Sequence, residues 1–215
     1  MVISNPKMST EQQMKVVLEE FTNTLNSIAG ACFDAIQGFH LNLNEIENSQ
    51  QNVIRQSNST EPENVQLQLL DSAWHMYGTG NPNDPNSVCY HQSTQRDFKA
   101  RNADGGTNHI FIGNMGLITI FSYWEHEFRT RLGDMFDVQS NCVQSDFFGD
   151  MRLIRNDILH NKGIATPRLS NCKILKWFKA NDPILIDQAK FIELLQTLKR
   201  GIKIEIIKQP PTTTI

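Results

Sequence analysis

The sequence predicts a mainly α-helical protein, an up-and-down helical bundle with a short two-stranded β element near the C-terminus. Apolar residues recur at intervals of three and four along most of the chain, which is the period of amphipathic helices. The segments 173–178 and 202–207 are the candidates for the two strands, and a helix expected over 190–200 separates them. Helices of this kind bury their apolar faces against one another, which defines the fold class.

The first half of the chain begins with a clear helical pattern. A cap at residues 9–11 precedes apolar residues at helical spacing, and we expect this helix to end near Phe39. The polar stretch 41–55 is expected to form a second, exposed helix. Pro62 ends that pattern, and a third helix is expected over 63–77.

Residues 78–108 are expected to form a loop-rich insertion. The stretches 78–86 and 103–108 are rich in glycine, asparagine and aspartate, which favour turns. Between them, a short helix within 88–102 carries the basic residues Arg96, Lys99 and Arg101. Such a cluster is typical of a solvated face, and the alternative is that it helps to hold RNA. We therefore expect a single helical domain over 1–215 that contains this insertion.

The second half of the chain contains the two strongest helical patterns. Residues 109–136 are apolar over a wide arc, which predicts a central helix. A further helix of roughly four turns is expected between Ser145, a fair N-cap, and Gly163, a natural stop. Its expected core face consists of Phe147, Met151, Ile154 and Ile158.

The composition excludes several classes of protein. The net charge is −3 and the isoelectric point about 6.1, so any contact with nucleic acid must be local. The longest apolar run, around 110–123, is too short and too polar to span a bilayer, and the N-terminus has no signal pattern. The four cysteines are scattered, and we expect reduced thiols and a cytoplasmic protein without membrane contact.

Arg155 is anomalous in its helix because its guanidinium falls within an apolar arc. A cation among apolar side chains must find an anion or lose hydration free energy. The anion is either a structural carboxylate, for which Glu125 and Glu127 on the preceding helix are candidates, or a phosphate of a ligand. In a third interpretation the side chain snorkels to the surface. The helical wheel places Arg155 between Met151 and Ile158 on one side and Phe148 and Leu159 on the other.

His160, together with Arg155, forms a minimal set for cleavage of RNA without a metal ion. An imidazole can accept the proton of the 2′-hydroxyl or donate one to the leaving 5′-oxygen. A guanidinium can bind the phosphate oxygens where negative charge develops. On a straight helix the two side chains point about 140° apart. Two copies of the helix that meet across a two-fold axis would place both pairs around one cleft.

Two further polar residues of this helix have open roles. Asn156 lies four residues before His160, so its amide can orient the imidazole, contact the phosphate or face solvent. Asp157 can act on the imidazole of His160, or it can pair with Arg152 or Lys162.

The segment 155–160 (RNDILH) fits the R-x4-H signature of HEPN domains, in the form with a polar residue directly after the arginine. The continuation 161–165 (NKGIA) resembles bacterial HEPN proteins in which this motif closes the last helix. Upstream, 123–132 (YWEHEFRTRL) is similar to a segment on the preceding helix of such proteins. The resemblance covers about residues 110–207.

This resemblance implies a metal-independent endoribonuclease, without cofactor, that works as a homodimer and leaves a 2′,3′-cyclic phosphate and a 5′-hydroxyl. His160 would act as acid or base, Arg155 would hold the phosphate and Asn156 would support them. The implied roles are toxin–antitoxin systems, phage defence or stress response, with RNA as substrate and an antitoxin or regulatory protein as partner. The alternative is a catalytically inactive HEPN-like module that binds RNA, nucleotide or protein. A third interpretation is a plain helical scaffold with Arg155 in a buried ion pair.

Other constellations give weaker signals. Cys89 and His91, together with His75 or His109, match no common zinc spacing, so no metal site is expected. Cys172 lacks the sequence context of a catalytic nucleophile. The three tryptophans are expected in the core.

Overall fold

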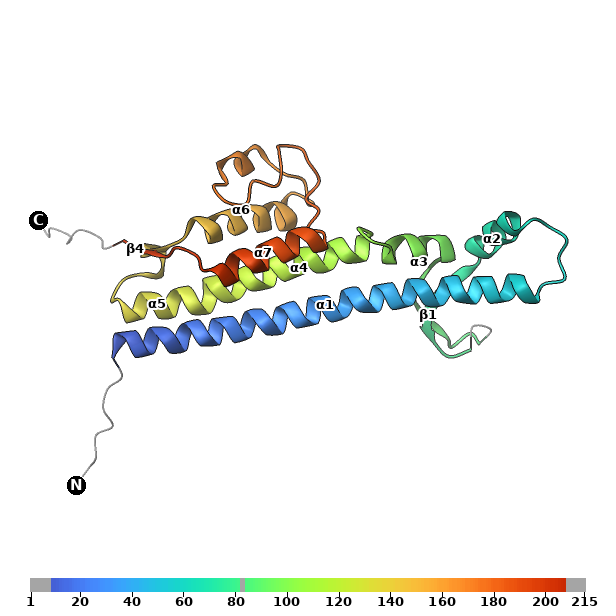
Figure 1. Cartoon of the computed structure of the whole chain (residues 1–215), viewed down its shortest axis with the longest axis horizontal. Coiled ribbons are helices and arrows are strands. Elements are labelled where there is room, and N and C mark those ends of the chain that lie inside the picture. Colours follow the sequence, from blue (N-terminus) through green and yellow to red (C-terminus); the bar gives the residue numbers. More distant parts are fainter. Residues whose placement is uncertain (1–8, 82–83, 208–215) are drawn as a thin grey trace, which may run out of the picture. The chain divides into compact units, whose positions relative to one another are not determined.

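The structure is a computed structural model that describes residues 9–81 and 84–207. It confirms that the chain is mainly α-helical with small antiparallel strand pairs (Figure 1). The chain divides into two compact units. The first unit consists of Met1–Cys32 and Gly113–Ile215, and the second consists of Phe33–Ile112.

Figure 1 labels the main helices and strands of the chain. In chain order they are α1 (Thr10–Gln56), α2 (Glu63–Ser72), β1 (Trp74–Thr79), β2 (Val88–Thr94), α3 (Gln95–Asn102), α4 (Thr107–Tyr123), the π-helix η1 (Trp124–Phe128), α5 (Arg129–Met135), the 3-10 helix η2 (Ser140–Cys142), β3 (Val143–Gln144), α6 (Asp146–His160), the 3-10 helix η3 (Pro167–Asn171), α7 (Gln188–Arg200) and β4 (Glu205–Ile206).

In the first unit, an aromatic cluster joins α1 to η1 and α6. The centroid of the Phe21 ring lies 4.7 Å from that of Phe128 and 6.0 Å from that of Phe148. The ring of Trp124 stacks on Phe148 at 3.9 Å. Since all four side chains are buried, this packing fixes three helices to one another. Figure 1 shows α4, α5 and α7 beside the N-terminal part of α1.

The central helix expected over 109–136 is confirmed, as a continuous run of α4, η1 and α5. Its middle is a single π turn at Trp124–Phe128. A π turn holds one residue more than an α turn, so it changes the direction of the side chains that follow. Both ends of this turn, Trp124 and Phe128, point into the core.

α1 is a single helix, so the expected end near Phe39 is wrong. One glycine inside a helix costs about 1 kcal/mol, and Gly38 alone does not interrupt the helix. The polar stretch 41–55 continues α1 because Gln50 within it is buried and bound to neighbouring elements of the second unit. Its Nε2 donates to Oδ1 of Asp71 at 2.9 Å.

In the second unit, the helices expected over 63–77 and within 88–102 each give way in part to a strand. β1 and β2 form an antiparallel hairpin in which Trp74 pairs with Thr94. The segments WHMYGT and VCYHQST are rich in aromatic and β-branched residues, which favour strands. Trp74 is 63% exposed, so its expected place in the core is wrong.

The insertion expected at 78–108 is therefore more ordered than a set of loops, because it contains most of this hairpin and all of α3. α3 is held by an ion pair of 2.6 Å between Lys99 and Asp71, and Gln50 bonds to both residues. This polar node ties α1, α2 and α3 together within the second unit. The expectation of a single domain over 1–215 stays a prediction.

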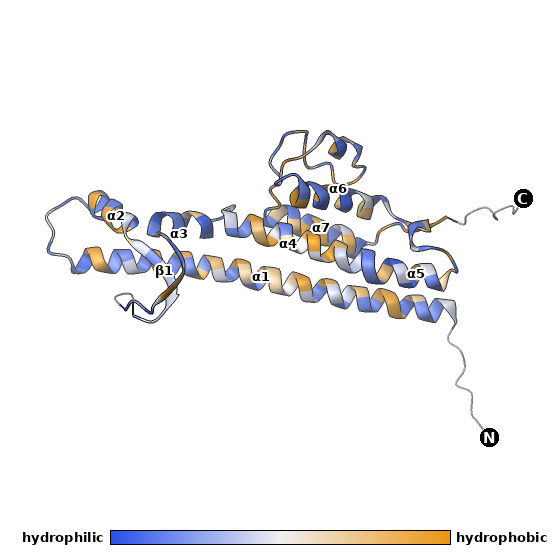
Figure 2. Cartoon of the chain, turned by 180° about the vertical axis from the view of Figure 1, so that it is seen from behind, coloured by the Kyte–Doolittle hydropathy of each residue, from blue (hydrophilic) through white to orange (hydrophobic). Residues whose placement is uncertain are grey.

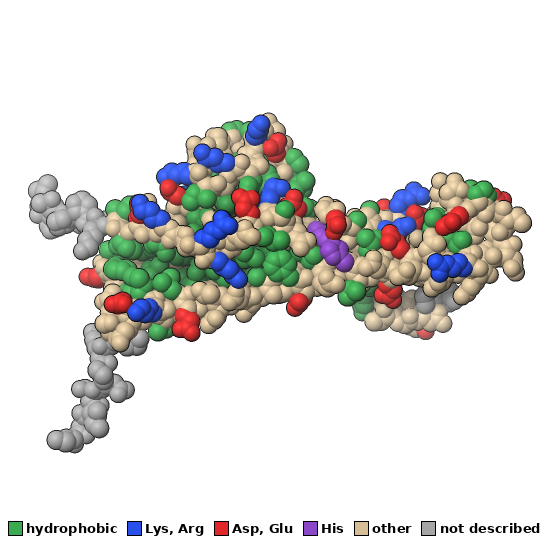
Figure 3. All heavy atoms as spheres, viewed as in Figure 1, with side chains coloured by type: hydrophobic (Ala, Val, Ile, Leu, Met, Phe, Trp, Pro, Cys, Tyr) green, Lys and Arg blue, Asp and Glu red, His purple; other side chains and the backbone are tan. Residues whose placement is uncertain are grey.

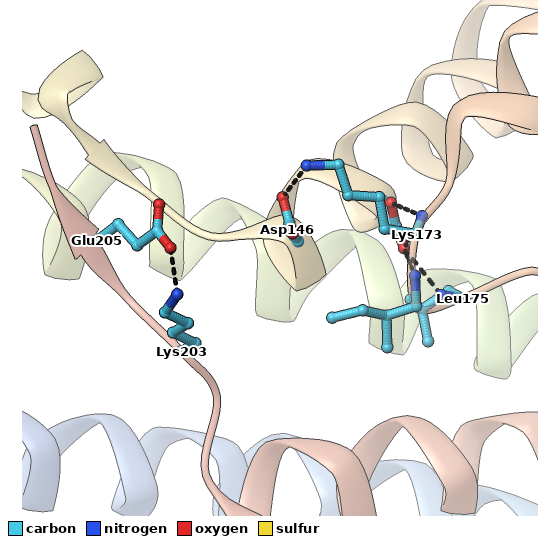
Figure 4. A network of polar contacts seen from close by, with 7 residues as sticks. Asp146, Lys173, Leu175, Lys203 and Glu205 are labelled. Atoms are coloured by element: carbon cyan, nitrogen blue, oxygen red, sulfur yellow. Dashed lines mark hydrogen bonds and ion pairs between the residues drawn. The ribbon is translucent and has the colours of Figure 1, made fainter.

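The strand pair near the C-terminus differs from the one expected. β4 pairs with β3, and residues 173–178 form no strand. The reason is the carboxylate of Asp150, which accepts the backbone N–H groups of residues 173–175 at 2.6–3.0 Å (Figure 4). A backbone N–H that is bound to a carboxylate is not available to a neighbouring strand.

No helix in the described part of the chain combines the length and the apolar character that a membrane crossing requires. α1 has the length, but Figure 2 shows hydrophilic residues along it from end to end. In the first unit, the same view shows hydrophobic residues concentrated in α4 and α7.

Gly113 on α4 is a position where no side chain fits. A Cβ atom there would lie 1.9 Å from the backbone oxygen of Ile186, so Gly113→Ala requires two backbone segments to separate. We expect this substitution to lower the free energy of unfolding by at least about 2 kcal/mol. Urea denaturation followed by circular dichroism measures the change.

Gly30→Ala on α1 is the matched control, because nothing lies within 4 Å of a Cβ atom at that position. It is expected to be neutral or to stabilise the protein by up to about 1 kcal/mol, since alanine favours the helix. Equal losses for the two substitutions would contradict the close approach at Gly113.

Candidate functional site

α6 positions all three residues of the expected site. Its N-terminal residue follows Ser145, which occupies the expected N-cap position, although its hydroxyl makes no capping hydrogen bond. The helix ends at His160, and Gly163 then takes a φ of 71°, which glycine adopts without strain. The expected core face is confirmed as buried for Phe147, Met151 and Ile154, whereas Ile158 is half-buried.

Asp157 is buried and fixes the segment that follows α6. Its carboxylate accepts hydrogen bonds from Nδ2 of Asn161 and from the backbone N–H of Thr166, both at 2.7 Å. The hydroxyl of Thr166 also lies 3.0 Å from Oδ2. Of the two roles that the sequence left open for Asp157, an ion pair with Arg152 or Lys162 does not occur among the described residues.

His160 and Asn156 lie at a common cavity near the C-terminal end of α6. The His160 side chain is exposed, and that of Asn156 is half-buried. The imidazole of His160, the amide of Asn156 and the guanidinium of Arg168 all line this cavity. Three such groups suit an anionic ligand. The cavity has a volume of about 190 Å³ and is lined by Leu153, Asn156, Asp157, His160, Asn161 and Arg168.

Arg155 is half-buried and has no ionic partner among the described residues. In the part of the chain that the structure describes, no carboxylate lies within 4.0 Å of its guanidinium. Its Nη1 donates to Oδ1 of Asn156 at 3.1 Å, while its Nε is buried and has no hydrogen-bond partner in residues 9–81 and 84–207. Arg155 does not line the cavity of His160, and Asn156 is the link between the two.

The acidic residues that were candidate partners of Arg155 are engaged by other arginines. Nη1 of Arg129 lies 2.9 Å from both carboxylate oxygens of Glu125. Glu127 pairs with Arg131 at 3.3 Å. The structural ion pair that would have explained Arg155 as part of a plain scaffold is therefore absent from the described residues.

Arg168 joins the site although no spacing in the sequence points to it. It lies on η3, and Thr166, two residues earlier, is bound to Asp157. The buried carboxylate thus anchors the loop that carries Arg168 to the cavity of His160. Only the folded loop shows that this arginine belongs to the site.

A second cavity lies over the N-terminal half of α6 and shares Leu153 with the first. Its volume is about 290 Å³, and its lining includes Arg129, Arg152 and Lys173. Nζ of Lys173 lies 2.6 Å from Oδ1 of Asp146 (Figure 4), and this contact raises the pKa of the lysine ammonium. Acidic side chains line the same cavity and pair with Arg129 and Lys173, so Arg152 is its basic group without an ion pair among the described residues.

The structure disfavours Cys172 as a catalytic nucleophile. Burial raises the pKa of the Cys172 thiol to about 12, and the neighbouring carboxylate of Asp150 adds to the shift. Such a thiol stays protonated at neutral pH, whereas a nucleophile needs the thiolate. Cys89, His91 and His75 are not among the described residues that lie close enough together to hold a metal ion.

Comparison of the chain with protein-family models, with curated proteins and with solved structures found no match. The resemblance to HEPN domains therefore rests on the residues of α6 and of the central helix, and it stays a prediction.

Asp157→Asn tests the anchor beneath the site. The substitution keeps the size of the side chain but replaces an acceptor oxygen by a donor that faces other donors. We expect the free energy of unfolding to fall by about 1–3 kcal/mol, measured by chemical denaturation. The exposed Asp134 offers a matched control, and Asp134→Asn should change stability by less than about 0.5 kcal/mol. A neutral Asp157→Asn would contradict the anchoring role.

Cys172 should resist alkylation in the folded protein. With a pKa of about 12, a fraction on the order of 10⁻⁴ of this thiol is ionised at pH 8. Iodoacetamide at that pH should modify the exposed Cys89 and leave Cys172 intact until denaturant is added. Mass spectrometry of peptides measures both sites, and native labelling of Cys172 ahead of Cys89 would refute the assigned burial and charge environment.

Proposed function

We propose that this protein is a HEPN-type endoribonuclease that cleaves RNA without a metal ion, through a composite site at a homodimer interface. The observation that carries the proposal is the guanidinium of Arg155, which is half-buried and has no carboxylate partner among the described residues. A buried cation without an anion is unfavourable. A phosphate of the RNA backbone supplies that anion.

The three residues have distinct roles in the proposed reaction. His160, which is exposed and able to exchange protons with a ligand, acts as general base or acid. Arg155 binds the phosphate oxygens, and Asn156, bonded to Arg155 and placed at the cavity of His160, positions both. The 2′-oxygen loses its proton to the base and bonds to phosphorus, while the bond to the 5′-oxygen breaks and that oxygen takes a proton. The products are a 2′,3′-cyclic phosphate and a 5′-hydroxyl.

A second copy of the chain completes the proposed site. Arg155 and His160 point about 140° apart on α6. Leu159 lies between them on the wheel and is 47% exposed. Figure 3 shows hydrophobic side chains gathered on one face of the first unit, and such surfaces are typical of protein contacts. Packing of α6 against its copy would cover Leu159 and bring each Arg155 towards the His160 of the other chain.

The proposed contact with RNA is local. Arg168 lines the cavity of His160 and Arg152 lines the neighbouring cavity, where Arg129 and Lys173 are paired with Glu125 and Asp146. Arg152 and Arg168 thus form a short basic strip. On the face shown in Figure 3, basic side chains are interspersed with acidic ones, in keeping with the net charge of −3. A short basic strip suits a few phosphates of a single strand. We place such an enzyme in the cytoplasm, in a toxin–antitoxin, phage-defence or stress response with a protein that restrains it.

One observation favours a second candidate function. Arg155 lines neither of the two cavities along α6 within the chain. A chain that never pairs with a copy would therefore keep its basic strip but lack a complete site. It would then be an inactive HEPN-like module that binds RNA, a nucleotide or a protein.

The proposal is tested by incubating the purified protein with total RNA in EDTA. Cleavage is expected to persist in EDTA and to fall by at least about 100-fold in His160→Ala and in Arg155→Ala, because each removes a group that acts in the transition state. His126→Ala and Arg200→Ala, at exposed positions of the first unit outside the cavities, are the matched controls and should keep activity. RNA retention on a gel without cleavage would favour the second candidate function, and loss of cleavage in the control variants would contradict the assignment.

The composite site is tested by mixing two inactive variants. A heterodimer of Arg155→Ala and His160→Ala contains one intact pair, made of the arginine of one chain and the histidine of the other. Random exchange of subunits should therefore restore about a quarter of wild-type cleavage. If both residues act from the same chain, the mixture stays inactive.

A further inference from the structure

A cluster of two imidazoles and one carboxylate lies in the second unit, on elements that the proposed cleavage does not use. It consists of His40 from α1, Asp104 from the turn between α3 and α4, and His109 from the first turn of α4. One ligand atom of each residue lies within 4.8 Å of the other two. Nε2 of His40 is 2.8 Å from Oδ1 of Asp104, and the centroids of the two imidazole rings are 5.1 Å apart.

His109 is the buried member of the cluster. The residue is only 2% exposed, and its Nε2 is buried without a hydrogen-bond partner in the described part of the chain. A buried polar nitrogen without a partner loses the hydrogen bonds that water would give it, so such atoms are rare in proteins. The ring of His109 is also packed on one side by Phe39, with 5.5 Å between centroids, which leaves the His40 side for a polar partner.

We propose that His40, Asp104 and His109 bind a divalent transition-metal ion, and that this ion is Zn²⁺. Imidazole and carboxylate are the donor types that Zn²⁺ accepts, and three protein ligands with one open position form a recurrent zinc geometry. Neutral imidazoles and one carboxylate leave a net charge of +1 on the site, which a bound water or hydroxide tolerates.

The present separations are close to those of a tetrahedral site. Ligands at about 2.0–2.1 Å from zinc lie about 3.3 Å from one another. The 2.8 Å contact of His40 with Asp104 therefore has to open, and all three ligand atoms already lie within 4.8 Å of one another. The side chain of Asp104 is 89% exposed and therefore free to make this adjustment. Its exposure also leaves the fourth position open to water.

The position of the ligands shows which elements a bound ion would connect. A bound ion would join the middle of α1 to the start of α4 and to the turn that precedes it, all within the second unit. Since metal bound only by the folded state stabilises that state, the ion would raise the melting temperature of this unit. The site is independent of Arg155 and His160, so it does not rest on the proposed cleavage.

The test uses the full chain after treatment with a chelator and dialysis. Titration with ZnCl₂ in a calorimeter is expected to give one bound Zn²⁺ per chain, with affinity lowered by at least about tenfold in His40→Asn and in Asp104→Asn. Both residues lie at least partly at the surface, so neither substitution removes core packing. Zn²⁺ should also raise the melting temperature of the wild-type chain and not that of the two variants.

Two control variants separate this site from adventitious binding. His91→Asn removes an exposed histidine of the same unit, and Cys89→Ser removes the exposed thiol. Both should bind Zn²⁺ as the wild type does, and Co²⁺ bound to the wild type should show no thiolate charge-transfer band. The proposal is overturned if the wild type binds no Zn²⁺, if the control variants lose as much affinity as His40→Asn, or if that thiolate band appears.

Discussion

Two buried carboxylates on α6 impose the constraint from which the candidate site follows. Asp150 and Asp157 are both buried, and a buried carboxylate must be fully hydrogen-bonded. The donors come from the chain after the helix: three successive backbone N–H groups of residues 173–175 for the first, and Asn161 with Thr166 for the second. The loop is therefore drawn back along α6, which turns Leu175 into the core and brings Arg168 to the cavity of His160.

The need of every buried polar group for a partner also separates residues that stabilise the fold from residues that are available to a ligand. Glu125 has Arg129, and Asp71 has Lys99 with Gln50, so these groups are explained by structure alone. Arg155 and His109 each keep a buried nitrogen without a partner in the described residues. Arg155 bonds to Asn156, which lines the cavity of His160, and His109 lies beside His40 and Asp104. These neighbours are the reason for proposing a phosphate as the ligand in one unit and a metal ion in the other.

The sequence predicted those features of the candidate site that depend on the geometry of a single helix. The helical period alone placed Arg155 apart from His160, and Asn156 on the same side as His160, and the structure keeps that arrangement on α6. The role of Asp157 was beyond this reasoning, since its partner Thr166 lies outside the helix. The sequence also could not predict that His40 lies beside Asp104 and His109, because His40 is far from the other two residues in the sequence.

Apolar residues at helical spacing determined the fold class, the central helix and the buried side of α6, because these features depend on residues within a few turns of one another. Tertiary contacts decided what the spacing left open. α1 continues past Phe39 because Gln50 has partners on other elements, and residues 173–178 are no strand because Asp150 takes their N–H groups. In each case a buried polar group forms hydrogen bonds with a part of the chain that is distant in sequence. A pattern of neighbouring residues does not reveal which distant segment supplies those bonds.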